Sequence, residues 1–224
     1  LGAGKDMENS NRSLILEKKP HKIGLYSCTE HEFSIAGENS AGAHPVEEGE
    51  DILALQELKR QTDYVILLYH GGVEFYPYPT PERLRRYVRA GADLVVCQHS
   101  HCIGCTETYQ NGVLVYGQGN FLFGERPEVE ANIQDLNAWE SGMAVCADIE
   151  EHNVEYLFYR NQNGRLDWTH EPEMLEKMQE RNKLLQTPGF LKEEWIRYCT
   201  GHVNYMEIFK KNFSERKLPW KSRI

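Results

Sequence analysis

The chain has 224 residues, a formal net charge of -9 and 40% hydrophobic residues. A chain of this length can bury a sizeable core, as one domain or as one domain with an appendage. The acidic balance argues against a nucleic-acid partner, because such binding depends on cationic side chains that face phosphates. No apolar run approaches the roughly 18 residues of a membrane span, so we expect no nucleic-acid partner and no span.

The amino-terminal part is predicted to contain one strand, one long loop and one helix. Residues 21–27 form the first strand candidate. Residues 29–49 carry Gly, Asn, Ala and Glu without periodicity and are predicted to form a loop, and loops of this length are often functional. A helix is expected over residues 50–61, because its apolar residues recur at helical spacing.

Two continuous apolar runs each end at an imidazole. Residues 63–69 lead into His70, and residues 91–98 lead into His99, with His101 two positions further on. Short runs that are rich in Val, Ile and Leu and do not alternate predict buried strands. In α/β proteins ligands bind beyond the carboxyl ends of such strands. The three histidines therefore predict a metal site, although a strand-end histidine such as His70 can also be a hydrogen-bonded turn residue.

The His-x-His spacing adds a geometric expectation. In extended backbone, His99 and His101 would point the same way, with α-carbons roughly 6.5–7 Å apart. That reach suits two metal ions separated by about 3.5–4 Å, as in hydrolytic two-metal sites. We therefore predict a divalent metal cofactor (Mn, Zn or Fe), with two ions in the intact protein as the fullest form of the site.

The loop after His70 carries the next candidates. Gly71 and Gly72 allow a close approach of the backbone to a ligand. Glu74 is a candidate for positioning substrate or a metal-bound water, with an exposed loop carboxylate as the alternative. A helix is expected to about residue 89, with Thr80 as its N-cap and Pro81 at its first position. This helix connects two apolar strands, which should therefore be parallel.

The six cysteines lie mostly in or beside apolar segments and do not form a disulfide framework, which favours a reducing compartment and a cytoplasmic location. Cys102 and Cys105 follow His99 and His101 closely enough to raise the alternative of a structural zinc knot. Zinc sites of this composition usually bring their ligand pairs from separate segments. Buried thiols are therefore the preferred interpretation.

Further along, residues 112–116 are predicted to form a strand that runs into a glycine-rich turn with Asn120, which either serves the site or stabilises the turn. Residues 142–149 and 154–159 are predicted to form two antiparallel strands. Beyond Asn161 the composition changes and two helices are expected.

We therefore predict a domain over residues 1–165 and a helical extension over residues 166–224. Three histidines in polar surroundings are predicted to lie at the surface: His44, His152 and His170.

Four motifs occur along the chain in one order: His70-Gly71-Gly72-x-Glu74, Ala-Gly-Ala-Asp-Leu-Val at residues 90–95, His99-x-His101, and Tyr-Gly-x-Gly-Asn-Phe at residues 116–121. This ordered set resembles the CapA family of capsule and poly-γ-glutamate synthesis proteins and covers roughly residues 1–159. The resemblance implies an α/β fold, a metallophosphoesterase-like β-sandwich flanked by helices, followed here by the helical carboxyl-terminal extension.

The resemblance also implies roles for the candidate residues. The metal ligands would be His70, His99 and His101, with His70, His99 and Glu74 as catalytic residues and Gly71, Gly72 and Asn120 at the substrate. The implied activity is a metal-dependent hydrolase or transferase reaction at a phosphoryl or acyl centre, in which metal-bound hydroxide attacks or a histidine acts as general acid. The expected substrate is small or polymeric and anionic. The alternative is a non-catalytic polymer-binding or assembly factor.

The chain also departs from the family. Its members carry an amino-terminal half with a Gly-Asp motif, a Glu-bearing turn and an Asn-His pair, and none of these occurs here. Two cations need a bridging carboxylate, which three neutral imidazoles do not provide. We therefore expect the carboxyl-terminal part of a longer protein, inactive by itself, that binds metal weakly or as a single ion. An unpaired sheet edge would favour a homodimer or folding beside the missing segment.

Overall fold

The computed structural model describes residues 1–31, 34–78, 80–122, 139–162, 164–169 and 172–202. The chain divides into two compact units, Leu1–Leu184 and Leu185–Ile224. This division differs from the predicted boundary after residue 165, because β11 (Arg165–Thr169) and nearly all of α4 (Pro172–Leu185) fall in the first unit.

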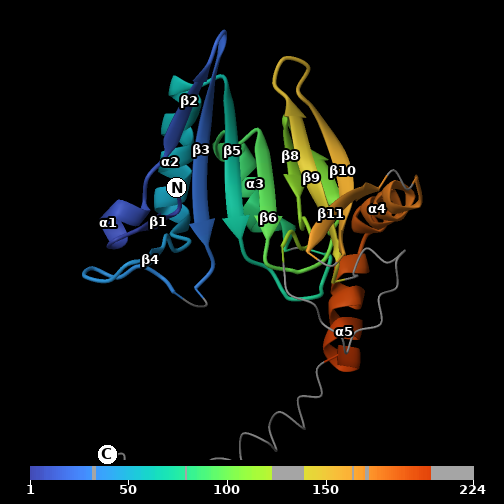
Figure 1. Cartoon of the computed structure of the whole chain (residues 1–224). Helices are drawn as coiled ribbons and strands as arrows, with labels where there is room; N and C mark the ends of the chain where they lie inside the picture. The colour runs from blue at the N-terminus through green and yellow to red at the C-terminus, as the bar shows by residue number, and fades with distance from the viewer. Residues whose placement is uncertain (32–33, 79, 123–138, 163, 170–171, 203–224) are drawn as a thin grey trace, which may run out of the picture. The chain divides into compact units, whose positions relative to one another are not determined.

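A six-stranded sheet forms the centre of the first unit (Figure 1), in the order β2-β3-β5-β6-β8-β7. Its strands are β2 (Leu14–Lys18), β3 (His21–Thr29), β5 (Tyr64–His70), β6 (Leu94–Gln98), β7 (Thr106–Tyr109) and β8 (Gly112–Val115). The four inner strands are parallel, and the two edge strands run antiparallel to their neighbours. The predicted parallel pair of apolar strands is therefore confirmed, and its carboxyl ends meet at one edge of the sheet.

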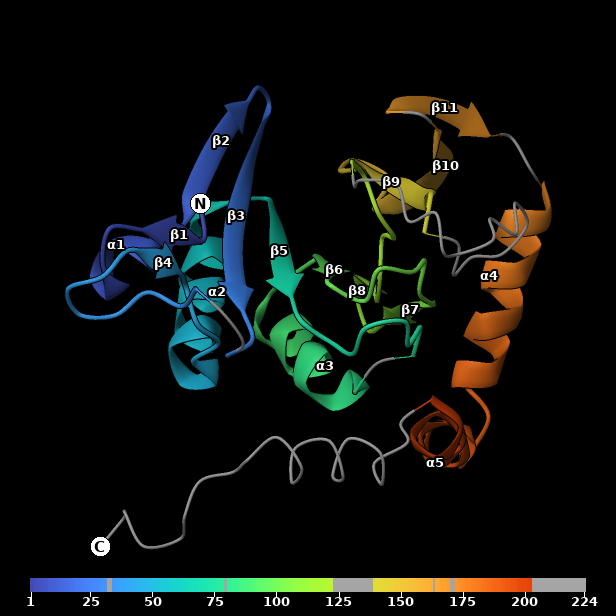
Figure 2. The ribbon, with the colours of Figure 1, turned by 60° about the horizontal axis from the view of Figure 1, so that its bottom comes forward.

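Two helices cover one face of this sheet: α2 (Glu48–Gln61) and α3 (Pro81–Ala90). Figure 2 shows both on the side opposite β9, β10 and β11. A β-carbon added at Gly24 of β3 would meet Leu58 of α2, and one added at Gly112 of β8 would meet Val88 of α3. Both helices were predicted, but Thr80 makes no side-chain capping hydrogen bond to α3.

A second sheet packs on part of the other face. It consists of β9 (Ser141–Asp148), β10 (Asn153–Gln162) and β11, in the order β11-β10-β9. Its buried Met143 and Phe158 share a hydrophobic core with Leu94 and Val96 of the first sheet and with Met174 of α4. The expected β-sandwich flanked by helices is therefore confirmed, as is the predicted antiparallel pairing of β9 with β10.

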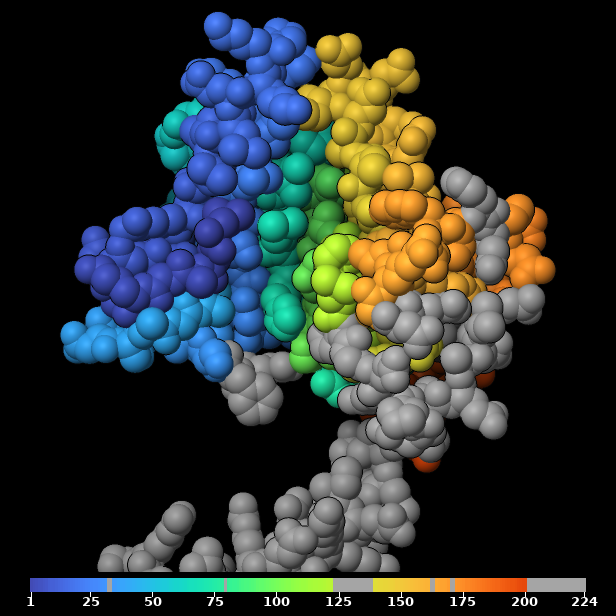
Figure 3. All heavy atoms as spheres, viewed as in Figure 1, coloured from blue at the N-terminus to red at the C-terminus, as the bar shows by residue number. Residues whose placement is uncertain are grey.

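The remaining part of that face is apolar and only partly covered. Leu14, Leu16 and Leu68 are 45%, 42% and 40% exposed. They lie on the same face, because Leu14 is in register with Leu25 and Leu68 with Ser27. In the space-filling view (Figure 3), the surface is hollowed between the blue atoms of β2–β3 and the yellow atoms of β9–β10.

The region predicted as a long loop contains a short strand. β4 (Gly42–Ala43) pairs with β1 (Ala3–Gly4), next to the short helix α1 (Met7–Ser10). The prediction of a surface position for His44 is wrong: its side chain is 1% exposed, and its Nε2 lies 2.8 Å from the hydroxyl of Tyr26. Among the other two, His152 is exposed and His170 lies outside the described residues.

The second unit contains α5 (Phe190–His202). Its Trp195 and Tyr198 rings stack with centroids 5.8 Å apart. Within the described ranges, no helix combines the length and the apolar character needed to cross a membrane.

Candidate metal and substrate site

The parallel strands bring the three predicted histidines to one edge of the sheet. His70 is the last residue of β5, and its register partner Gln98 ends β6 directly before His99. The ring centroids of His70 and His99 are 5.1 Å apart, and those of His99 and His101 are 6.0 Å apart. The expectation that these side chains gather beyond the strand ends is therefore met.

The expected extended geometry of the His-x-His motif is wrong. β6 ends at Gln98, and the φ angles of His99 and His101 are 105° and 54°. Left-handed backbone in a residue other than glycine costs on the order of 1–3 kcal/mol and persists only where the surroundings hold it. Here the Phe75 N–H donates to the Ser100 carbonyl at 2.7 Å, which ties this turn to the loop after β5.

Asn120 determines the tautomer of His101. Its side-chain amide group donates to the Trp139 carbonyl at 2.8 Å, so its Oδ1 faces the Nδ1 of His101 at 2.7 Å. An oxygen in that position requires a proton on Nδ1, which leaves Nε2 as the lone-pair nitrogen of the neutral ring. Metal-binding histidines are usually oriented by an oxygen acceptor that receives the N–H of the ring nitrogen away from the metal, and Asn120 Oδ1 is in that position for Nδ1 of His101.

Two aromatic residues that the sequence analysis missed surround His101. The ring centroids of Trp139 and Phe75 lie 5.2 Å and 6.2 Å from the ring of His101, and they lie 6.4 Å from each other. Phe75 is 38% exposed and has a φ angle of 58°. Phe75 therefore combines a left-handed backbone with an aromatic ring that lies beside His101 and Trp139.

The two glycines after His70 are required for different reasons. A β-carbon at Gly71 would lie 2.7 Å from the side chain of Glu30, whereas Gly72 has open space around it but a φ angle of 117°. Glu30 is the residue directly after β3, and no motif drew attention to it. Glu74 is exposed on the same loop, and its catalytic role stays a prediction.

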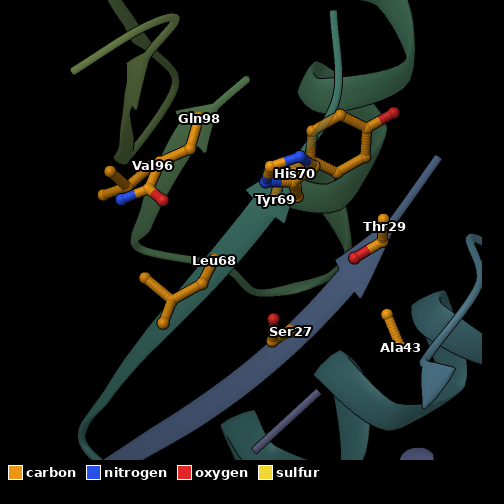
Figure 4. A pocket seen from close by; sticks show the side chains of 8 residues that line it. All are labelled: Ser27, Thr29, Ala43, Leu68, Tyr69, His70, Val96 and Gln98. Carbon is orange, nitrogen blue, oxygen red and sulfur yellow. The ribbon is translucent and has the colours of Figure 1, made fainter. Parts of the chain in front are cut away.

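A depression of about 390 Å³ lies on the open face of the sheet next to His70. Figure 4 shows Leu68 and His70 along β5, with Ser27 and Thr29 on the neighbouring strand β3. The remaining lining residues are Ala43, Tyr69, Val96 and Gln98. Among the described residues, the lining therefore combines an apolar floor with hydroxyl, amide and imidazole groups and includes no Lys or Arg side chain.

The thiols of Cys102 and Cys105 are fully buried, and the Cys105 thiol donates to the Pro77 carbonyl. Burial raises the pKa of Cys105 to about 12, so the thiol is protonated in the metal-free protein. Within the described part of the chain, no group of three or more His, Cys, Asp or Glu side chains is arranged to hold a metal ion. The buried thiols match the preferred interpretation of Cys102 and Cys105, the zinc knot stays an untested alternative, and the predicted histidine ligands are neighbours without forming an assembled triad.

The fold and these side chains define the class of protein: an α/β protein with three neighbouring histidines at the carboxyl ends of parallel strands. The sequence profile of the bacterial capsule synthesis proteins, PGA_cap, matches residues 1–125. The chain therefore belongs to this family of bacterial capsule synthesis proteins. The matched segment contains all of the predicted site residues.

Two curated relatives agree with this assignment. The chain is 28% identical over 131 residues to the PGA biosynthesis protein CapA of Bacillus subtilis (strain 168), an alignment that covers 55% of this chain and 34% of that protein. It is 33% identical over 103 residues to the capsule biosynthesis protein CapA of Bacillus anthracis, which covers 43% of this chain and 25% of that protein. The alignments thus span about a third or less of these relatives.

Among solved structures, the chain is similar to a novel phosphatase from Mycoplasma pneumoniae, with a TM-score of 0.39 and 15% identity over 73% of this chain and 59% of that one. It is also similar to a hypothetical protein from Thermus thermophilus, with a TM-score of 0.35 and 13% identity over 69% of this chain and 58% of that one.

Proposed function

We propose that this chain serves the biosynthesis of a capsule or of a poly-γ-glutamate-like, polyanionic cell-envelope polymer, through a metal-dependent site of hydrolase or transferase type. The observation that carries this proposal is the gathering of His70, His99 and His101 at the carboxyl ends of two parallel strands, with the tautomer of His101 set by Asn120. Membership of the capsule synthesis family supports the biosynthetic role.

The donor set fits one ion better than two. Imidazole suits zinc and iron, and metal–nitrogen distances of about 2.0–2.1 Å place the ring centroids of two ligands of one tetrahedral ion roughly 5 Å apart. The His70–His99 separation of 5.1 Å meets this requirement, whereas the 6.0 Å between His99 and His101 exceeds it. Three neutral imidazoles also do not offset the charge of two divalent cations.

Each site residue would have its own role in this proposal. A bound cation supplies Lewis-acid activation of water and stabilisation of developing negative charge. His70, His99 and His101 would hold it, with Asn120 keeping the proton of the neutral His101 ring on Nδ1 so that Nε2 can serve as a ligand. Glu74 and the backbone at Gly71 and Gly72, on the loop that follows His70, would contact a small or polymeric anionic substrate. The named residues of the depression include no cationic side chain, so substrate charge would be met by the metal.

The test is a metal titration of chain purified without a polyhistidine tag and stripped with a chelator. We expect one Zn²⁺ or Mn²⁺ ion per chain, held weakly, by isothermal titration calorimetry. His99→Ala should abolish this binding, whereas His152→Ala, at an exposed turn, should leave it unchanged. No binding would remove the metal-dependent part of the proposal, and two tightly held ions would mean that further ligands exist in the chain.

A second candidate, a polymer-binding or assembly factor, is favoured by the exposed ring of Phe75 next to the histidines. Assays of turnover and of polymer binding distinguish the enzyme from the binding factor. We expect little hydrolysis of a generic phosphomonoester or phosphodiester, because the proposed ligands include no carboxylate to bridge two ions. Metal-dependent hydrolysis that is lost in His99→Ala would establish the enzyme. Poly-γ-glutamate binding that is lost in Phe75→Ala, without turnover, would establish the binding module, and a homodimer is compatible with either.

A further inference from the structure

The carboxylate of Glu30 lies against the turn formed by His70, Gly71 and Gly72. Its backbone N–H donates to the His70 carbonyl at 2.9 Å, which extends the pairing of β3 with β5 by one residue. Its Oε2 accepts from the Gly72 N–H at 2.9 Å. The residue is therefore bonded to the turn through both its backbone and its side chain.

The two glycines of the turn are complementary to this carboxylate. The absence of a side chain at Gly71 leaves the space that the Glu30 side chain occupies, because a β-carbon there would lie 2.7 Å from it. Gly72, whose φ angle of 117° favours glycine, donates its N–H to Oε2. The two glycines thus make room for the Glu30 carboxylate at the end of β3, and they also allow the chain to bend.

The other carboxylate oxygen is held by two partners. Oε1 accepts from the Tyr69 hydroxyl at 2.8 Å and from Arg83 of α3 at 2.9 Å, and Arg83 also donates to the Tyr69 hydroxyl at 3.0 Å. Burial raises the pKa of Tyr69, so its hydroxyl stays protonated and can donate. These contacts fix both oxygens of Glu30 from three directions, which is the arrangement expected of a residue that orients a neighbour.

We propose that Glu30 is a positioning residue: it fixes the His70-Gly71-Gly72 turn and thereby the direction of the His70 ring at the strand end. The part of this inference that concerns metal rests on the proposed function. The part that concerns the turn does not.

The chain contains a matched control for this network. Glu107 accepts from Arg85, also on α3, at 2.6 Å and from the Tyr116 hydroxyl at 2.6 Å. This second glutamate–arginine–tyrosine cluster has the same chemistry and uses the same helix. These hydrogen bonds do not reach the turn after His70. A general effect of losing such a cluster would therefore appear equally in Glu30 and Glu107 variants.

The test compares Glu30→Ala and Glu107→Ala by amide hydrogen exchange and by the ring ¹⁵N signals of His70, both in metal-free protein. In Glu30→Ala we expect the Gly72 amide to exchange at least about tenfold faster and the His70 signals to shift. In Glu107→Ala both should match the unsubstituted chain. Glu30→Gln keeps an acceptor oxygen, so it should restore most of the Gly72 protection, and it also serves if Glu30→Ala does not fold.

A metal titration of the same variants completes the test. We expect Glu30→Ala to weaken metal binding about tenfold or more, as loss of an orienting contact usually does, while Glu107→Ala leaves it unchanged. An unchanged Gly72 exchange rate, or an equal change in the two alanine variants, would overturn the positioning role. Failure of the unsubstituted chain to bind metal would overturn only the proposed function, because the exchange result stands without it.

Discussion

Asn120 is the residue on which the orientation of the candidate site depends most directly. Its amide joins the ring of His101 to the carbonyl of Trp139, and its side chain is 2% exposed. Replacing Asn120 would remove both of these hydrogen bonds at once. The same side chain therefore stabilises the fold and orients the site. A substitution there should consequently change both.

We predict that Asn120→Ala lowers the free energy of unfolding by about 1–3 kcal/mol, because it leaves buried polar groups without their partner. It should also weaken metal binding about 10- to 100-fold through loss of the His101 orientation. Urea denaturation and metal titration measure the two effects. Asn39→Ala, at an exposed asparagine, is the control and should stay within about 0.5 kcal/mol. A stable Asn120→Ala variant with unchanged metal affinity would contradict both parts.

The thiols give a second prediction for single residues. Burial raises the pKa of Cys97 and of Cys105, so at pH 8 both stay protonated and unreactive, because thiolate is the reactive form. Cys146 is exposed. We therefore expect a thiol reagent at pH 8 to label Cys146 quickly and Cys97 and Cys105 only after denaturation, as read by mass spectrometry. Rapid labelling of Cys105 in the folded chain would show that its surroundings are open to solvent.

Among the structural elements, the turn after β5 shows why a strand end can depend on a neighbouring strand. Gly71 is closed in by Glu30, which comes from the end of β3. The constraint on Gly71 therefore comes from the pairing of β3 with β5, and not from the residues next to Gly71 in the chain. The same pairing places the carboxyl ends of β3, β5 and β6 side by side, which is where the histidines lie.

We predict that Gly71→Ala destabilises the chain by about 1–3 kcal/mol, because the Glu30 side chain must move and lose its bond to Gly72. If Glu30 is the cause, the double variant Glu30→Ala/Gly71→Ala should cost less than the sum of the single variants. Gly49→Ala, at a helical position with nothing within 4 Å, should be neutral or slightly stabilising. Strict additivity in urea denaturation would mean that the two residues act independently.

For the molecule as a whole, the open apolar face of β2, β3 and β5 has the largest consequence for behaviour in solution. Leu14 and Leu16 of the edge strand β2 and Leu68 of β5 are all more than a third exposed. Contiguous exposed apolar surface and an unpaired strand edge both favour association.

We expect the purified chain to self-associate in a concentration-dependent way, measured by light scattering after size exclusion. Leu16→Glu should shift it toward monomer, because it places a charge on that face at the edge strand. Leu53→Glu, at a leucine of α2 that is 64% exposed, should not. A chain that is monomeric at high micromolar concentration would show that this face does not pair with a second copy.

Local patterns predicted the inner part of the fold well. The continuous apolar runs of β5 and β6, the spacing in α2 and the proline at the start of α3 act over a few residues, so they can be read from the chain alone. The strands that were missed, β1, β2, β4, β7 and β11, are all edge strands of their sheets. Each is stabilised on one side by a neighbouring strand, and a short or alternating sequence acquires its strand character from that pairing.

The amino-acid sequence by itself determined that three histidines stand at the ends of buried parallel strands, because strand ends and side-chain types are local properties. Only the tertiary structure decided how they are oriented. The left-handed backbone of His99 and His101, the Asn120 contact and the Glu30 carboxylate all depend on residues that are distant in sequence. Packing and long-range hydrogen bonds set these features, so they cannot be predicted from the periodicity of the sequence.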